Sequence, residues 1–89
     1  MSDREPVKSY RHGSKDRNVQ AAIWKNETAD GRTFHNVTFK LQYKDGGQWK
    51  DASSYGAGDL YNLIRCATDA VAFLFFELVR DKRDLEKAA

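Results

Sequence analysis

Basic and aromatic side chains alternate with small polar ones between residues 24 and 50 of the chain. Basic groups attract phosphates, and flat rings between them can stack on unpaired bases, at about 1–3 kcal/mol for each base. This combination suits a nucleic-acid single strand better than a duplex, because nothing in the sequence resembles a groove-reading helix. A lysine-rich sheet face is also often only a solvated face that protects strand edges, and that interpretation stays open.

The sequence contains no arrangement that is typical of catalysis. It has no nucleophile elbow, no phosphate-binding glycine loop, no metal-ligand spacing and no paired carboxylates that would raise a pKa. Cys66 lies among small apolar residues and is more typical of a buried apolar residue than of a reactive thiol. His35 is more typical of a half-buried histidine than of a ligand. We therefore expect no enzyme activity, no metal and no cofactor.

The composition predicts one small domain. The chain has 89 residues, a formal net charge of +2 and a single cysteine, so no internal disulfide can form. The longest apolar run, "AVAFLFF", is seven residues, against the roughly twenty that a membrane helix needs. The N-terminal segment contains no apolar signal sequence, so we expect a cytoplasmic protein without membrane contact.

Alternation and turn signals predict four antiparallel strands joined as a meander. The strands are expected over residues 7–12, 19–26, 33–44 and 48–55, and the turns are "GSKDRN", "ETADGR" and "KDGG". Residues 1–6 are predicted to be a disordered tail, 7–80 a single domain and 81–89 a frayed, charged helix end. The third strand is long enough that we expect it to curve or to project into a dimer.

The alternation divides the third strand into an apolar face and a wet face. Ile23, Val37 and Phe39 are predicted to face the helix and form core, whereas Trp24 and Phe34 lie on the other side. The wet face of the sheet is predicted to carry polar, basic and aromatic side chains: Phe34, Asn36, Thr38, Lys40, Gln42 and Lys44, with Trp24, Gln48 and Lys50 nearby.

A long helix is predicted from Ala57 onward, with Gly56 as its N-cap and Asp59 favourably placed for the helix dipole. An apolar stripe along the helix is predicted to cover the sheet: Leu60, Leu63, Ile64, Ala67, Val71, Leu74, Phe75 and Leu78. Phe73 and Phe76 fall on the opposite side, and one sheet cannot bury both faces. We therefore expect a homodimer with Phe73 and Phe76 at the interface.

The order of elements, an α+β arrangement of four antiparallel strands followed by one long C-terminal helix (ββββα), resembles a known superfamily. The segments that carry the resemblance are "YRHG", "VQAAIW", "TFHNVTFKLQYKDG", "WKDASSY" and "GDLYNLI". They are similar to the single-stranded-DNA-binding transcriptional coactivators, positive cofactor four and its bacterial and phage relatives. The resemblance spans about residues 7–80 and also extends to a family of short bacterial proteins with that architecture.

The resemblance implies a helix-packed homodimer whose curved sheets bind single-stranded DNA with low sequence specificity. By strand position it implies phosphate contacts from Lys25, Arg32, Lys40, Lys44 and Lys50, and stacking on Trp24, Phe34 and Trp49. The chain departs from the coactivators in its interleaved acids, Glu27, Asp30, Asp45 and Asp51, and it lacks a long serine-rich or lysine-rich arm. The alternative prediction is a protein-interaction module that uses an exposed strand edge or a helix face.

Overall fold

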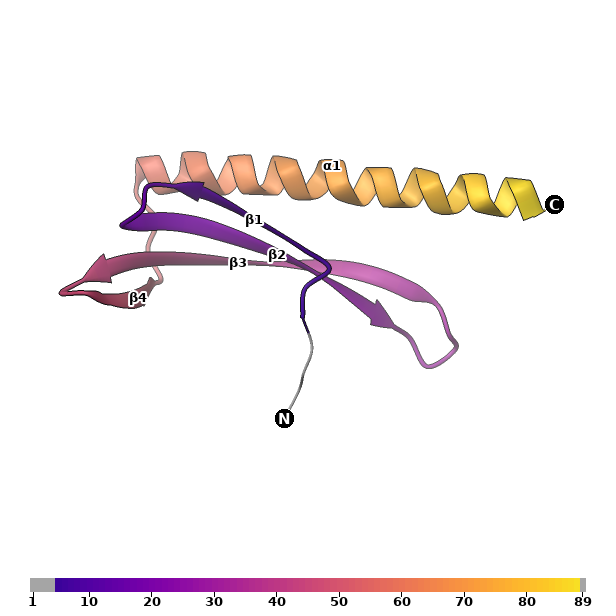
Figure 1. The fold of residues 1–89 in the computed structure, drawn as a ribbon, viewed down its shortest axis with the longest axis horizontal. Helices are drawn as coiled ribbons and strands as arrows, with labels where there is room; N and C mark the ends of the chain where they lie inside the picture. Colours follow the sequence, from indigo (N-terminus) through magenta and orange to yellow (C-terminus); the bar gives the residue numbers. More distant parts are fainter. Residues whose placement is uncertain (1–4, 89) are drawn as a thin grey trace.

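Four antiparallel strands form one sheet, and a single long helix lies along one of its faces (Figure 1). The computed structural model describes residues 5–88, with the side chains of residues 5–77. The strand order is β1-β2-β3-β4, which confirms the predicted α+β fold and its ββββα order. The elements are β1 Lys8–Gly13, β2 Arg17–Glu27, β3 Thr33–Asp45, β4 Gln48–Ala52 and α1 Ala57–Ala88.

The two hairpin turns form where the glycines predict them. Gly31 closes the turn between β2 and β3 with a φ of 87°. Gly46 and Gly47 join β3 to β4 with φ values of 58° and 83°, the pair of positive values that a two-residue type I′ turn requires. This tight turn pairs Asp45 with Gln48 and so sets the register of the short fourth strand.

The sheet is four strands wide at only one end. β1 pairs with residues 18–23 of β2, and β4 pairs with residues 41–45 of β3. Beyond these segments β2 and β3 continue as a two-stranded arm that curves away from α1 (Figure 1). The long third strand therefore projects, as predicted, and the chain is elongated. Its radius of gyration is 16.3 Å, whereas a compact chain of this length has about 12 Å.

Asp59 ties the start of the helix to the start of β2. The backbone N–H of Leu60 donates to the Gly56 carbonyl at 2.9 Å, and the Gly56 N–H donates to Asp59 Oδ2 at 2.9 Å, which confirms Gly56 as the N-cap. Arg17 donates to the same carboxylate through Nε at 2.8 Å and Nη2 at 2.7 Å. These charge-assisted bonds lower the pKa of the buried Asp59 carboxyl to about 2.

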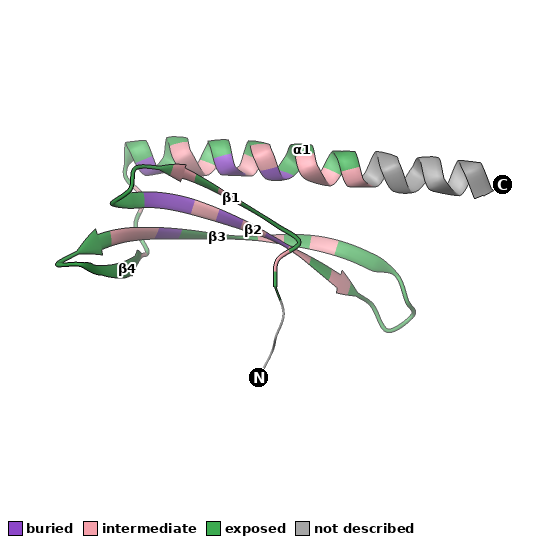
Figure 2. Ribbon diagram, in the orientation of Figure 1, coloured by how far each residue is buried: buried purple, intermediate pink, exposed green. Residues whose placement is uncertain are grey.

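The core is small and lies where α1 crosses β1 and β2 (Figure 2). The buried apolar side chains in the described part of the chain are Val19, Ala21, Ile23, Leu41, Cys66 and Ala70. Tyr10 and Leu63 pack against this cluster from β1 and α1. Several of these residues are small, so the helix approaches the sheet closely while little apolar surface is removed from water.

The prediction that Phe39 is a core residue is wrong. Its side chain is on the same face as Leu41, but 42% of Phe39 is exposed. The helix lies over β1 and β2 and leaves most of β3 uncovered. Ile23 is buried as predicted, and its cross-strand partner Val37 is half-buried against the core.

The helix also presents a different side to the sheet from the predicted one. Cys66 and Ala70 face the sheet, and Phe73, which is about 20° from Cys66 around the helix, is half-buried beside them. Four members of the stripe that was predicted to cover the sheet are exposed instead: Leu60, Ile64, Val71 and Phe75. Phe76 is exposed as predicted, but Phe73 is on the sheet side and not opposite it.

Part of the predicted organisation falls on residues that the structure does not describe. The predicted tail over residues 1–6 lies mostly outside the described residues, as do the side chains of Leu78 and of the predicted frayed end, 81–89. The backbone of α1 continues as helix through residue 88. Among the described residues, no helix combines the length and the apolar character that a membrane crossing needs.

Asp59→Asn should destabilise the fold at neutral pH by about 1–2 kcal/mol, since Asn lacks the charge that Arg17 and the Gly56 N–H bind. The folded-state pKa of Asp59 is below its ordinary value of 3.8, so the native carboxylate stabilises fully above about pH 4 and loses this effect as pH falls toward about 2. Urea unfolding at equal protein concentration measures both effects. Asp16→Asn, at an exposed turn, is the control. A variant as stable as the native chain at pH 7 would contradict this role.

Candidate nucleic-acid interface

The sheet face that is turned away from α1, here called the open face, collects most of the predicted binding residues. Cross-strand partners share a face, and Val19 and Leu41 mark the helix side, so the register assigns every second strand residue to the open face. Its principal side chains are Arg11 from β1, Asn18, Gln20 and Trp24 from β2, Phe34, Lys40, Gln42 and Lys44 from β3, and Trp49 and Asp51 from β4.

All three aromatic side chains that were predicted to stack, Trp24, Phe34 and Trp49, are on this face. Phe34 is 48% exposed and Trp49 is 47% exposed, so each offers a ring surface to a ligand. Trp24 is half-buried, and its indole N–H donates to Thr38 Oγ1 at 2.9 Å, which fixes the orientation of the ring. Trp49 is at the four-stranded end and Phe34 is on the arm, so a ligand that contacts both must extend along the sheet.

The cations of the open face are Arg11, Lys40 and Lys44, all of them exposed. Lys40 Nζ lies 3.7 Å from Asp51 Oδ1, a long and solvent-exposed pair that contributes little stability. In the described part of the chain, neither Arg11 nor Lys44 has a side-chain ion pair or hydrogen bond. Phosphate groups could therefore replace water around these cations without breaking a strong internal bond.

The carboxylates that are interleaved with the basic residues in the sequence are mostly off this face in space. Asp45 accepts from Lys50 Nζ at 3.0 Å on the helix side of the sheet, and Glu27 alternates onto that same side. Asp30 accepts from Arg32 Nε at 3.1 Å in the turn at the end of the arm. Asp51 is thus the one carboxylate among the strand residues of the open face. The departure from the coactivator pattern is smaller in three dimensions than in the sequence.

Three of the predicted phosphate contacts are not on the open face. Lys25 alternates with Trp24 and lies on the helix side, where it lines a hollow with Glu27 and Thr33. Lys50 pairs with Tyr43 and is also on the helix side, as is Gln48, so the prediction that they share a face with Lys40 is wrong. Arg32 lies in the turn. The tight Gly46-Gly47 turn determines which residues of β4 share a face with Lys44, since it pairs Trp49, and not Lys50, with Lys44.

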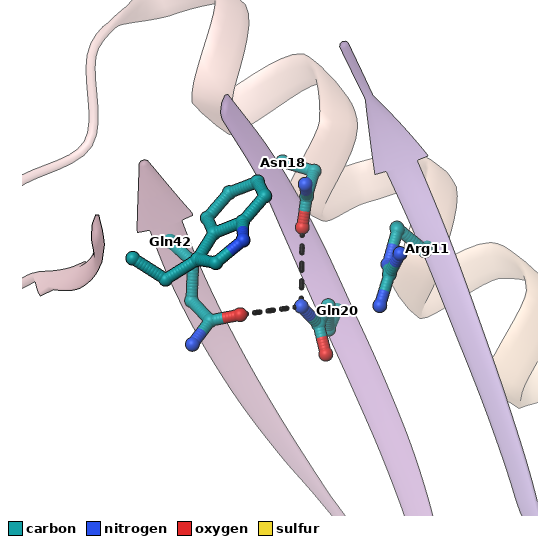
Figure 3. Close-up of a pocket in the computed structure, with 5 residues that line it drawn as sticks. Arg11, Asn18, Gln20 and Gln42 are labelled. Carbon is teal, nitrogen blue, oxygen red and sulfur yellow. Dashed lines mark hydrogen bonds between the residues drawn. The ribbon is translucent and has the colours of Figure 1, made fainter. Parts of the chain in front are cut away.

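The open face has a hollow of about 270 Å³ that the sequence analysis missed. Arg11, Asn18, Gln20 and Gln42 surround it (Figure 3), and Trp49 completes its lining. Alternation alone gave Arg11 a face on the first strand, but only the pairing of Arg11 with Gln20 brings it to this place. The connection between β1 and β2 carries no two-residue turn signal, so the sequence contains no simple cue to that register.

The groups that could support catalysis are engaged in structure. Cys66 is buried, as predicted, where its thiol donates to the Val19 carbonyl at 3.3 Å and burial raises its pKa. His12 Nε2 lies 2.5 Å from Asp69 Oδ2 and links β1 to α1. Within the described residues, no three His, Cys, Asp or Glu side chains gather as a set of metal ligands.

Comparison with protein-family models, with curated proteins and with solved structures finds no match to this chain.

Proposed function

We propose that this protein binds single-stranded nucleic acid, and single-stranded DNA in particular, along the open face of its sheet. The observation that carries the proposal is the composition of that face. Its described strand residues include three exposed cations and two exposed aromatic rings, but only one carboxylate. Cations hold phosphates and rings stack bases, the two contacts that suffice for binding an unpaired strand. No covalent step is involved, so the proposed activity is binding and not catalysis.

The spacing of the cations fits a nucleic-acid strand that runs along β3. Lys40 and Lys44 are four residues apart on β3, or about 13 Å, so they would contact different phosphates. Phe34 and Trp24 would take bases along the arm, and Trp49 a base at the four-stranded end. Phosphates and ring faces carry little sequence information, so most of this surface would discriminate poorly between bases.

A single strand fits better than a duplex because α1, over the residues whose side chains are described, presents no basic face that could enter a groove. The outward side of α1 carries Leu60, Ile64 and Val71. These apolar side chains offer no charge or hydrogen bond to the phosphates that line a duplex groove. The resemblance of the chain to the single-stranded-DNA-binding coactivators points in the same direction. It suggests a cytoplasmic protein that acts in transcription, replication or repair.

We further propose that the protein is a homodimer joined along α1. The seam consists of residues spaced alternately four and three apart: Leu60, Ile64, Ala67, Val71 and Leu74. This is the heptad pattern of a two-stranded coiled coil, with β-branched residues at the a positions and Leu at two of the three d positions. The seam lies about 80–160° around the helix from the sheet-facing Cys66, so a second helix can pack there without displacing the sheet.

Phe73 and Phe76, the residues first predicted at the interface, are outside this seam. Phe73 is on the sheet side, and Phe76 is about 80° from Cys66 in the direction away from the seam. The elongated shape and small core of the single chain are a further argument for the second copy, since one sheet covers only one side of α1.

An alternative function uses the strand edges of the arm. In the described structure β2 beyond Ile23 pairs with β3 alone, and β3 before Leu41 pairs with β2 alone, so the outer edges of the arm present backbone donors and acceptors. An extended segment of another protein could add to either edge. Affinity capture in the presence of nuclease distinguishes this function, because a protein partner would remain bound after the nucleic acid is removed.

The double variant Lys40→Ala, Lys44→Ala should weaken binding to a labelled oligo-dT about tenfold and flatten the dependence of log affinity on log salt by about 1.4. Lys25→Ala, Lys50→Ala is the matched control, with the same charge change on the same sheet but on the helix side. Fluorescence anisotropy at several salt concentrations, with a duplex as competitor, measures these values. Equal effects of the two double variants, or no binding by the native protein, would overturn the proposal.

Ile64→Glu should convert the dimer to a monomer, because a carboxylate at an a position would be buried against its symmetry mate. Ala72→Glu is the matched control, since this exposed position is on the Phe76 side of α1. Light scattering with circular dichroism measures mass and helix content together. A dimer that survives Ile64→Glu but is lost in Ala72→Glu would move the interface to the Phe76 side.

A further inference from the structure

The hollow on the open face spans all four strands. Arg11 stands on β1 at one side, Asn18 and Gln20 on β2 and Gln42 on β3 form its floor, and Trp49 on β4 stands at the other side. Three strand spacings separate β1 from β4, or about 14 Å, and the register offsets Trp49 from Arg11 by four positions along the strands, or about 13 Å. The two side chains therefore border the hollow at diagonally opposite corners. The hollow thus has a ring surface at one wall, a cation at the other and amides between them (Figure 3).

A chain of hydrogen bonds fixes which way the floor amides point. Asp51 can only accept, and Gln42 Nε2 donates to Asp51 Oδ1 at 3.3 Å, so Gln42 turns its oxygen toward Gln20. Gln20 Nε2 donates to Gln42 Oε1 at 2.7 Å and to Asn18 Oδ1 at 3.2 Å (Figure 3). Both amide hydrogens of Gln20 are therefore used, and its Oε1 remains as an acceptor that no described residue engages.

Beside this acceptor lies a set of donors. Arg11 is the direct cross-strand partner of Gln20, and its guanidinium makes no hydrogen bond or ion pair with the described residues. The hollow therefore offers a planar donor fork next to one fixed acceptor, and an exposed indole ring beyond them. A ligand that complements it is flat and carries two adjacent acceptors beside a donor.

Cytosine has this pattern on a single ring, and guanine has it on a double ring. Guanine O6 and N7 are adjacent acceptors that an arginine fork contacts in pairs, and its N1–H is a donor next to O6. Adenine presents an amino donor where guanine has O6, so it would place a donor against the guanidinium. Cytosine has two adjacent acceptors, O2 and N3, beside its amino donor, but its single ring covers less of an indole, so stacking on Trp49 favours guanine. Thymine is also a single ring and has no two adjacent acceptors.

We propose that the hollow is a binding site for one unpaired guanine within the bound strand. The base stacks on Trp49, Arg11 donates to O6 and N7, and Gln20 Oε1 accepts from N1–H. This site rests on the proposed function, since the phosphates of the strand are held by the rest of the open face, and it adds a base preference at one position of an otherwise unselective surface.

The test compares oligo-dT with the same oligonucleotide carrying one central guanine, adenine or cytosine, by fluorescence anisotropy with the full chain. The guanine strand should bind about tenfold more tightly than the other three. Arg11→Lys keeps the charge but loses the fork, so the ratio of guanine-strand affinity to oligo-dT affinity should fall to about one. Arg65→Lys, on the exposed side of α1, is the matched control and should retain the preference.

A second variant, Trp49→Leu, removes the exposed ring and should also abolish the preference. Equal binding of all four strands by the native protein, a preference for another base, or a guanine preference that survives Arg11→Lys would overturn the guanine site while the proposed function stands. Absence of binding to every strand would overturn both.

Discussion

The carboxylate of Asp59 determines how the helix is placed on the sheet, and most of the structure depends on that placement. It receives two guanidinium N–H groups of Arg17, at the first residue of β2, and the N–H of the helix N-cap. Further along α1, the Cys66 thiol donates to the Val19 carbonyl, and Asp69 lies against His12. These three contacts run along one side of the helix, so they fix its rotation as well as its position.

This rotation does not bury the most apolar side of α1. The polar anchors require Cys66 and Ala70 to face β1 and β2, and the larger apolar residues Leu60, Ile64 and Val71 are then turned outward. The buried thiol and the buried carboxylate each need a partner, whereas apolar residues at a helix surface need only some apolar cover. The polar contacts therefore determine which side of α1 faces the sheet. In the proposed homodimer, a second copy of the chain would supply the cover on the other side.

Local signals in the sequence were sufficient for the elements but not for their faces. The strands follow from alternation, the hairpins from Asp30-Gly31 and Gly46-Gly47, and the helix start from Gly56 and Asp59. The exposure of Phe39 and the orientation of α1 depend on the pairing of Arg17 with Asp59, 42 residues apart in the chain, and periodicity contains no information about it. The face of Lys50 could have been predicted, because a two-residue turn fixes the parity of the next strand.

The turn at Gly46 and Gly47 also determines which charged side chains of β4 lie on the open face. With Gly46 and Gly47 as the two turn residues, Asp45 and Lys50 both fall on the helix side, where their side chains form an ion pair. Trp49 falls on the open face beside Lys44, where it forms one wall of the hollow. A register shifted by one residue would exchange these positions, since every side chain of β4 would change face. The ring would then leave the hollow and Lys50 would join the open face without its carboxylate partner. The character of the candidate interface thus depends on a turn that has no contact with it.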